Sequence, residues 1–324
     1  MKPLIIINNA AARARRAWPV IKAQLEQAGI AYDAVETTAP GDATHLARDA
    51  FGNQCALVAV VGGDGTLSEA AAGYFAPADA SEDNLPAAIN AEAALAILPS
   101  GTGDDFARTL IGRREPLAYW ISLFVDHCRN PKHENTKLVD AIRVRTDGYT
   151  RPVICINAST LGLGGETATR VAAQGETIRK LSGEVRFAAA VVGALAAWRE
   201  KPTRVTINKN ILIERPMNLV AVANARFAGG GMMLSPTAEL NDAQFDVVTA
   251  SGLNRAGILR ELTRIHRGGH VVNPKVRIDK ATEVTIETVS LEDALLIEVD
   301  GNVSGRTPAD YRIMPAVLRV VTPS

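Results

Sequence analysis

The chain of 324 residues lacks a net charge: 35 Lys and Arg residues stand against 35 Asp and Glu residues. No overall electrostatic field therefore attracts nucleic acid or an anionic membrane, and we expect no nucleic-acid partner. With 47% hydrophobic and 22% charged residues, the composition excludes a disordered chain. At roughly 150 residues per domain, the length predicts about two domains.

Cysteine is scarce as well. Cys55, Cys128 and Cys155 are far apart and lack the spacing of a metal site, so we expect free thiols in a reducing cytosol. Long apolar runs are also missing, because the longest, residues 187–198, falls short of the roughly 20 residues that cross a bilayer. These absences predict a cytoplasmic protein that meets a membrane only from its surface.

Residues 1–134 alternate short apolar runs with helical patterns, which predicts a parallel sheet covered by helices. The predicted strands and the helices that follow them are 4–7 with 18–28, 56–61 with 67–74, and 94–98 with 106–110. A polar insert, residues 77–90, is interpreted as a surface loop.

From about residue 137 the apolar residues alternate with period two, which predicts a second, mainly β domain. The candidate strands are 138–145, 153–159, 204–207, 211–214, 219–224, 284–288 and 295–299. A turn at Asn208-Lys209-Asn210 predicts a hairpin, and residues 184–198 form one helical interruption. An exposed edge strand of this domain would support a homodimer, although no motif requires one.

The strongest motif follows the strand 56–61 and reads Gly62-Gly63-Asp64-Gly65-Thr66-Leu67-Ser68-Glu69. Glycines let the backbone approach a ligand closely, and Thr66 with Glu69 has capping-box spacing, which places a helix N-terminus just after them. Such an arrangement is typical of phosphate binding, where Asp64 would hold Mg²⁺ or accept a hydrogen bond from an attacking hydroxyl. A simple tight turn is the structural alternative.

A second loop, Pro99-Ser100-Gly101-Thr102-Gly103-Asp104-Asp105, follows the strand 94–98 and enters a helix. A plain helix start capped by Thr102 with Asp105 is the structural alternative. Loops at the carboxyl ends of parallel strands gather at one edge of a sheet. We therefore expect the two glycine-rich loops to face one crevice.

These two motifs resemble those of the diacylglycerol-kinase catalytic family, in particular the soluble bacterial lipid kinases related to sphingosine and ceramide kinases. The likeness spans nearly the whole chain. Further matching positions in the family's order are Asn8, Thr37 before Gly41-Asp42-Ala43, Asn157, residues 224–232, residues 236–242 and Asp300-Gly301.

The resemblance implies an α/β nucleotide-binding domain related to that of NAD kinases (residues 1–134), then a β-sandwich lipid-substrate domain (residues 135–307), with the active site in the cleft between them. We expect residues 308–324 to pack back onto the first domain. ATP contacts are implied at Asn8, Thr37, Gly62, Gly63, Asp64, Gly65, Thr66, Leu67, Ser68, Gly101 and Thr102. A structural Mg²⁺ is implied in the loop 239–244, held by the Asp242 carboxylate and the backbone carbonyls of Glu239 and Gln244.

Three positions depart from the family's pattern. Asn8-Asn9-Ala10-Ala11 replaces Asn-Pro-x-x-Gly, and Asp104 replaces an Asn, adding a negative charge that favours Mg²⁺ or a neighbouring cation as its partner. Asp300-Gly301-Asn302 replaces Asp-Gly-Glu, whose Glu is the family's proposed general base. The amide of Asn302 cannot accept a proton, and a general base contributes about 10²–10⁴-fold in rate.

Positioning and charge neutralisation nevertheless dominate phosphoryl transfer, so Asp64 or Asp300 would take over that role while Asn302 orients the acceptor hydroxyl. We therefore predict an ATP- and Mg²⁺-dependent kinase that phosphorylates a primary hydroxyl of a membrane lipid, either diacylglycerol or a sphingoid or ceramide lipid. Its contact with the inner membrane would be transient, because the chain has neither an anchor nor a net positive charge.

Two alternatives stay open. A catalytically impaired lipid- or nucleotide-binding regulatory protein is favoured by Asn302, and an NAD-kinase-like enzyme acting on a soluble nucleotide would share the first glycine loop.

Other candidate residues are interpreted as structural. Arg13, Arg15 and Arg16 are predicted to form a solvated helix face. His266 and His270 have a metal-like spacing, but the glycines between them disfavour a helix, so we expect solvated or loop histidines.

Overall fold

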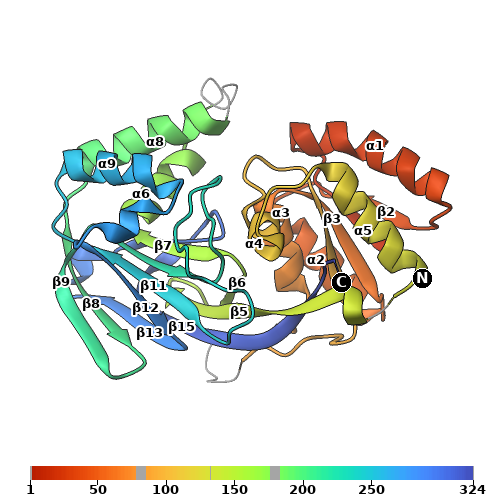
Figure 1. The fold of residues 1–324 in the computed structure, drawn as a ribbon. Coiled ribbons are helices and arrows are strands. Elements are labelled where there is room, and N and C mark those ends of the chain that lie inside the picture. The colour runs from red at the N-terminus through yellow and green to blue at the C-terminus, as the bar shows by residue number, and fades with distance from the viewer. Residues whose placement is uncertain (1, 78–84, 132, 176–182, 324) are drawn as a thin grey trace. The chain divides into compact units, whose positions relative to one another are not determined.

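The structure is a computed structural model that describes residues 2–77, 85–131, 133–175 and 183–323. The chain forms two compact units (Figure 1). Unit 1 comprises Met1–Ala141, Leu240–Ala243 and Met314–Ser324, and unit 2 comprises Ile142–Glu239 and Gln244–Ile313. The predicted domain limits did not include residues 240–243 in the first unit.

Unit 1 is built on a parallel sheet in the order β2-β1-β3-β4, which the end of β15 extends by pairing Val320 with Leu95. Its strands are β1 (Leu4–Ile7), β2 (Asp33–Glu36), β3 (Leu57–Gly62) and β4 (Ala94–Pro99). Every residue of β3 is buried, as expected for a strand of continuous apolar sequence that helices cover on both faces.

The helices of unit 1 are α1 (Ala12–Ala28), α2 (Asp42–Gly52), α3 (Asp64–Gly73), α4 (Asp105–Ile111) and α5 (Leu117–Arg129), followed by the short 3₁₀ helix η1 (His133–Asn135). Helices α1 and α5 contact each other, as do α2 and α3, and the two pairs cover opposite faces of the sheet (Figure 1). Gly73 allows the close approach of α3 to α2, because a Cβ atom there would collide with the carbonyl oxygen of Thr44.

Unit 2 is mainly β. Its strands are β5 (Thr136–Asp147, which begins in unit 1), β6 (Val153–Cys155), β7 (Ala158–Gly162), β8 (Lys201–Ile207), β9 (Ile211–Met217), β10 (Leu219–Ala223), β11 (Phe245–Ala250), β12 (Val276–Ala281), β13 (Glu283–Thr288), β14 (Leu296–Val299) and β15 (Asn302–Val321, which ends in unit 1). The run β12-β11-β10-β7-β14 is antiparallel, as are the pairs joining β9, β8, β13 and β15. These strands enclose an apolar core that includes Ile142, Val222, Ile286 and Tyr311.

Helices α6 (Leu163–Ala172), α8 (Gly183–Ala197) and α9 (Arg255–Ile265) complete unit 2, with the short 3₁₀ helices η2 (Gly269–Val272) and η3 (Leu291–Asp293). Helix α6 contacts α8 and also covers β7 and β14. Leu163, Leu195 and Ile258 form a second apolar cluster beneath these helices. Within the described residues, no helix combines the length and the hydropathy needed to span a membrane.

The predicted fold class, an α/β domain followed by a β-sandwich, is confirmed. The hairpin at 208–210 is also confirmed, with Asn208 and Lys209 in the left-handed region of backbone space. The single predicted strand 153–159 is wrong, because the chain breaks between β6 and β7. The single helical interruption is wrong too, since α6 and α9 accompany α8. Part of the predicted surface loop 77–90, residues 78–84, lies outside the described residues.

The cysteines and histidines complete the comparison. All three cysteines are free, with Cys128 and Cys155 buried and Cys55 partly buried. His270 contradicts the solvated prediction: it is buried in η2, and its Nε2 atom lies 3.0 Å from the carbonyl oxygen of Leu234. Burial lowers the pKa of His270, which favours a neutral ring.

The close contact at Gly73 generates a stability prediction. We expect Gly73→Ala to lower the free energy of unfolding by about 1–3 kcal/mol, because the added methyl group overpacks the contact between α2 and α3. Gly52→Ala, at the end of α2 with open space around it, is the matched control and should be neutral or slightly stabilising. Urea unfolding of both variants measures the difference, and equal values would contradict the prediction.

Candidate active site

The two glycine loops touch each other at one edge of the unit 1 sheet. Gly62 at the end of β3 pairs with Pro99 at the end of β4, and the Ser100 amide donates to the Gly62 carbonyl at 2.8 Å. A Cβ atom built on Gly101 would lie 2.7 Å from the Cα atom of Gly63. Glycine is therefore required at this contact because no side chain fits between the loops.

Asp64 links the first loop to the helix that follows the second. Its two carboxylate oxygens accept hydrogen bonds from the amides of Asp105 (3.1 Å) and Phe106 (3.0 Å). These amides belong to the first turn of α4, where backbone N–H groups have no partner within the helix. Asp64 thus caps α4 from a neighbouring loop.

Both predicted capping arrangements are wrong. Helix α3 begins at Asp64 after Gly63, so Thr66 lies inside its first turn and does not cap it. Helix α4 begins after Asp104, which has a φ of +50°, so Thr102 lies outside the capping position. The two reasons differ: α3 starts directly after Gly63 without a side-chain cap, whereas the first amides of α4 donate to Asp64 of the other loop.

Asn8 and Thr37 lie at the same edge as the glycine loops. The Asn8 side-chain amide donates to the Thr66 hydroxyl at 2.8 Å, which fixes the loop after β1 against α3. Thr37 follows directly after β2, and its amide donates to the carbonyl of Ile7 at 2.9 Å. The predicted nucleotide contacts thus come from the ends of four adjacent parallel strands.

The remaining predicted contacts differ in exposure. The side chains of Leu67 and Ser68 are buried, whereas Thr102 is exposed. Gly65 lies in the first turn of α3 with open space around its Cα atom.

Asp104 shapes the second loop. Its Oδ1 atom accepts a hydrogen bond from the Gly101 amide at 2.8 Å, and its Oδ2 atom lies 3.8 Å from Arg114 Nη2. Burial raises the pKa of Asp104, and the nearby Asp64 carboxylate adds to the rise. Arg114 is therefore the neighbouring cation that the sequence led us to expect beside this charge.

The arginines of α1 lie on an exposed helix face, as predicted, and one of them also contacts the second glycine loop. Arg13, Arg15 and Arg16 are all exposed, but Arg13 Nη1 donates to the Gly101 carbonyl at 2.8 Å. The start of α1 is thereby attached to the second glycine loop.

In unit 2, Asp300 and Gly301 form the two-residue turn between β14 and β15, which pairs Val299 with Asn302. Their φ angles are +48° and +91°, as the Asp-Gly hairpin turn requires. The side chain of Asn302 is exposed.

The buried Asp300 carboxylate is surrounded by donors. It accepts hydrogen bonds from the amides of Ile156, Asn157 and Ala158 at 2.9 to 3.0 Å. The Cys155 thiol donates to it at 3.3 Å. Asp300 therefore accepts hydrogen bonds from the backbone N–H groups between the end of β6 and the start of β7. Because these groups bond to Asp300 and not to a neighbouring strand, the strand breaks here.

Glu298 is a titratable residue that the sequence analysis missed. Its carboxylate accepts a hydrogen bond from the Thr160 hydroxyl at 2.6 Å and another from the Gly301 amide. Burial raises the pKa of Glu298 to about 7, outweighing these hydrogen bonds. The available signal was a lone Glu between the apolar residues Ile297 and Val299 of a strand.

The predicted metal loop, residues 239–244, turns sharply at Ala243, whose φ is +59°. The buried Asp140 holds this turn by accepting the Ala243 amide at 2.8 Å. Among the described residues, no group of three or more His, Cys, Asp or Glu side chains is placed to hold a metal ion. The predicted site differs from such a group because it uses one side chain, the Asp242 carboxylate, and two backbone carbonyls, those of Glu239 and Gln244. Oxygen donors of this kind suit a hard cation.

The chain thus combines an α/β unit, in which two glycine loops touch, with a β-sandwich, and this combination of domains can be compared with known families. Residues 2–139 match the diacylglycerol kinase catalytic domain, and residues 162–322 match the YegS C-terminal NAD kinase beta sandwich-like domain. The chain belongs to the diacylglycerol kinase catalytic family and is a lipid kinase.

Curated relatives match over most of their length. The chain is 27% identical to the diacylglycerol kinase of Bacillus subtilis over 301 residues, covering 93% of this chain and 88% of the relative. It is also 27% identical to the diacylglycerol kinase of Mycobacterium tuberculosis H37Rv, covering 87% and 82%. A crystal structure of a diacylglycerol kinase from Bacillus anthracis aligns with a TM-score of 0.68 at 21% identity, over 99% of this chain and 96% of that one, which shows a shared fold.

The raised pKa of the partly buried Glu298 generates a pH prediction. Because its pKa is raised from 4.5 to about 7, the folded state holds a proton that the unfolded state releases, so stability falls as pH rises through this window. Glu298→Gln removes this loss, so the variant should gain stability relative to the unaltered protein between pH 5 and pH 8.

Urea unfolding at both pH values measures the gain, with Glu292→Gln, at an exposed position, as the matched control. A difference between Glu298→Gln and the unaltered protein that stays the same at both pH values would contradict the assignment.

Proposed function

We propose that this lipid kinase uses ATP and Mg²⁺ to phosphorylate the primary hydroxyl of diacylglycerol. The observation that carries the proposal is the contact between the two glycine loops at Gly63 and Gly101, where α3 and α4 both begin. The first turn of α3, directly after Gly63, offers backbone N–H groups to phosphates, whereas the first two amides of α4 already donate to Asp64. The choice of diacylglycerol rests on the names of the curated relatives.

In the proposed reaction the lipid hydroxyl oxygen attacks the γ-phosphorus, and the bond from that phosphorus to the β,γ-bridging oxygen breaks as ADP leaves. The residues of unit 1 hold the phosphates in line for this displacement. Asn8 contributes by fixing Thr66 and the first turn of α3, and Asp64 contributes by fixing the start of α4.

The hydroxyl proton needs an acceptor. Asn302 has no basic atom, and the Asp300 carboxylate already receives four donors. Each Asp64 oxygen accepts one backbone hydrogen bond and has a second lone pair. We therefore assign proton acceptance to Asp64 and orientation of the acceptor hydroxyl to the exposed Asn302, with Asp300 as the residue that shapes its turn.

Mg²⁺ bound with ATP would neutralise phosphate charge. A separate, structural Mg²⁺ would stabilise the loop 239–244 through the Asp242 carboxylate and the carbonyls of Glu239 and Gln244. The contact of Ala243 with Asp140 supports this role, because it fixes the backbone that carries Asp242.

Contact with the membrane is proposed to be peripheral and transient, through α8 and α9 of unit 2. Val192 on α8 is 62% exposed and Leu259 on α9 is 47% exposed. Arg255 of α9 donates to the Ala196 carbonyl of α8 at 2.8 Å, which places a cation beside these apolar side chains. Apolar residues flanked by arginines suit the surface of an anionic bilayer.

A regulatory protein that binds lipid or nucleotide without turnover is the second candidate, favoured by the amide at Asn302. The phosphate-transfer experiments described next separate the kinase from this binding protein.

The central prediction concerns phosphate transfer from labelled ATP, with Mg²⁺, to mixed micelles of diacylglycerol, ceramide or sphingosine, with NAD as a soluble acceptor control. We expect labelled phosphatidic acid from diacylglycerol and a loss of at least about 100-fold in Asp64→Asn, because the amide removes the proposed proton acceptor. Asp49→Asn, at an exposed position of α2, is the matched control and should keep full activity. Binding of ATP and lipid without any transfer would establish the regulatory candidate instead.

Asn302→Glu tests the role of the hairpin turn. We expect turnover to rise by about tenfold or more, because a carboxylate at this position adds a general base worth up to about 10²–10⁴-fold. The steady-state rate at saturating ATP measures the gain, and Asn302→Gln controls for side-chain length. A rate equal to that of the unaltered protein would show that the acceptor hydroxyl does not meet this position.

A further inference from the structure

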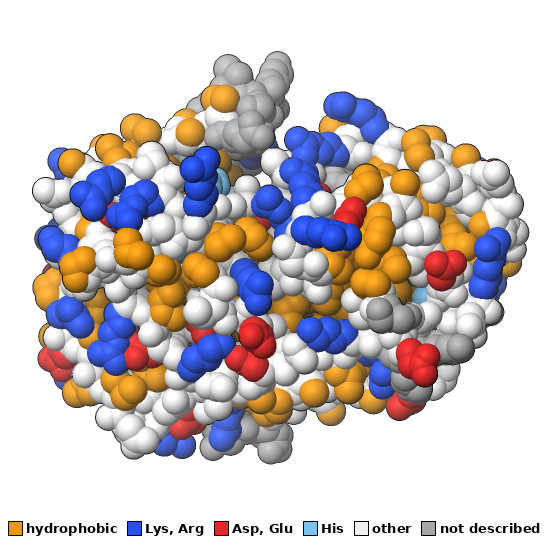
Figure 2. Space-filling model, viewed as in Figure 1, with side chains coloured by type: hydrophobic (Ala, Val, Ile, Leu, Met, Phe, Trp, Pro, Cys, Tyr) orange, Lys and Arg blue, Asp and Glu red, His pale blue; other side chains and the backbone are white. Residues whose placement is uncertain are grey.

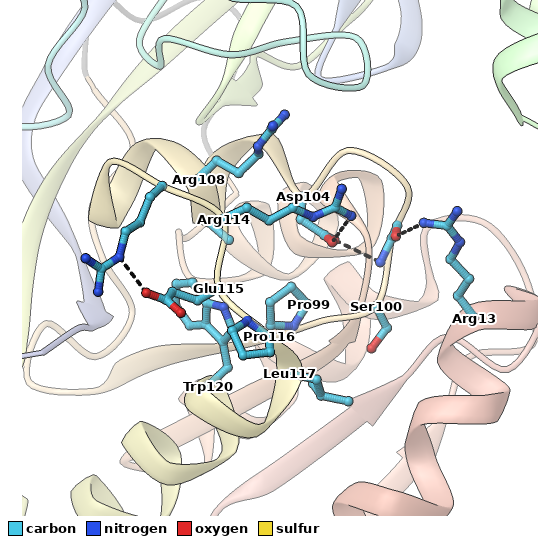
Figure 3. A pocket seen from close by; sticks show the side chains of 13 residues that line it. Arg13, Pro99, Ser100, Asp104, Arg108, Arg114, Glu115, Pro116, Leu117 and Trp120 are labelled. Atoms are coloured by element: carbon cyan, nitrogen blue, oxygen red, sulfur yellow. Dashed lines mark hydrogen bonds and ion pairs between the residues drawn. The ribbon is translucent and has the colours of Figure 1, made fainter.

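A cavity of about 250 Å³ lies in unit 1 beside the second glycine loop and carries an excess of positive charge (Figure 3). Four arginines line it, from the start of α1, from α4 and from the linker between α4 and α5: Arg13, Arg108, Arg113 and Arg114. Asp104 and Glu115 are the acidic residues of the lining. The lining therefore has two more positive than negative side chains.

The arginines are held by contacts with the loop. Figure 3 shows Arg13 and Arg114 reaching the loop from opposite sides. Arg13 donates to the Gly101 carbonyl at 2.8 Å, and Arg114 donates to the Thr102 carbonyl at 3.5 Å. These contacts orient the guanidinium groups before any ligand arrives.

The linker supplies a third cation. Arg113 Nε lies 2.5 Å from the Glu115 carboxylate, which fixes its side chain next to the start of α5. A guanidinium group has five N–H donors, and the contacts of Arg113 with Glu115 and of Arg114 with Thr102 use only part of them. The remaining donors suit a planar, two-pronged grip on a phosphate group.

The rest of the wall is apolar. Pro99, Leu117 and the buried Trp120 line the cavity, so a ligand that fits combines an anionic group with a carbon skeleton. The volume lies below the roughly 300–1,000 Å³ of pockets that enclose drug-sized ligands. A small phosphate ester matches this space, whereas a whole nucleoside triphosphate exceeds it.

We propose that this cavity, which adjoins the predicted nucleotide contact Gly101 and includes none of residues 62–68, is a binding site for a small phosphate ester. The ester is either free in solution or the headgroup of an anionic phospholipid. Because Arg13 attaches α1 to the second glycine loop, an occupied cavity would also steady the loop that carries Gly101. The site does not require kinase activity, so its test stands apart from that of the proposed function.

Titration calorimetry without ATP tests the site, with glycerol 3-phosphate and inorganic phosphate as probes. We expect the unaltered protein to bind glycerol 3-phosphate and the double variant Arg113→Ala/Arg114→Ala to bind it at least about tenfold more weakly, since charge-assisted hydrogen bonds are lost. Arg15→Ala/Arg16→Ala removes the same charge from exposed positions of α1 outside the cavity and should bind normally.

Co-sedimentation with phosphatidylcholine vesicles, with and without phosphatidylglycerol, identifies the source of the ester. A loss confined to glycerol 3-phosphate supports a soluble ligand, and a loss on phosphatidylglycerol vesicles supports a lipid headgroup. The proposal is overturned when the unaltered protein binds neither probe, or when both double variants lose binding equally. Thermal melts of all three proteins, with phosphate transfer measured in parallel, separate a folding defect from a lost site.

Discussion

The first unit depends on one interaction, the capping of α4 by the Asp64 carboxylate. Two amides of α4 need acceptors, and the sequence before that helix supplies none, because Asp104 turns its own carboxylate back onto Gly101. Asp64 therefore has to come from the neighbouring strand end, and the loops have to touch for it to reach. The glycines at 63 and 101 make that contact possible, so the motif is a single structure formed from two separate segments.

The second unit uses a carboxylate in the same way at Asp300. There the donors are consecutive amides at the gap between β6 and β7, and the carboxylate comes from a hairpin turn that begins more than 140 residues later. Both aspartates look catalytic in the sequence, because each precedes a glycine at a family motif. In the structure each carboxylate also accepts hydrogen bonds from backbone N–H groups that would otherwise lack an acceptor. Loss of either side chain therefore combines a chemical effect with a structural one. The matched Asn variant separates the two better than Ala does, because its carbonyl oxygen still accepts one of the hydrogen bonds.

The sequence predicted the elements that depend on local pattern and missed those that depend on distant partners. The apolar runs of β3 and β4 and the hairpin turn at Asn208 were evident because each depends only on a few consecutive residues. The long strand β15 was missed because its twenty residues alternate between exposed and buried environments that lie in different units. The break after Cys155 was missed because it depends on Asp300. At the site, motif spacing placed the glycine loops correctly but missed the capping, since α3 starts without a side-chain cap and the cap of α4, Asp64, comes from the other loop.

Charge distribution explains why the chain carries a cationic cavity despite having no net charge. Lys and Arg side chains are scattered over the visible face, with acidic and apolar side chains between them (Figure 2). Screening over about 8–10 Å makes local clusters the effective unit for recognising an anion. Arg113 and Arg114 form such a cluster because α4 and α5 are joined by a short linker against the second glycine loop. The second glycine loop thus lies beside a cluster of guanidinium groups, and an anion held by that cluster would act on the backbone of Gly101, itself a predicted nucleotide contact, through the bond from Arg13.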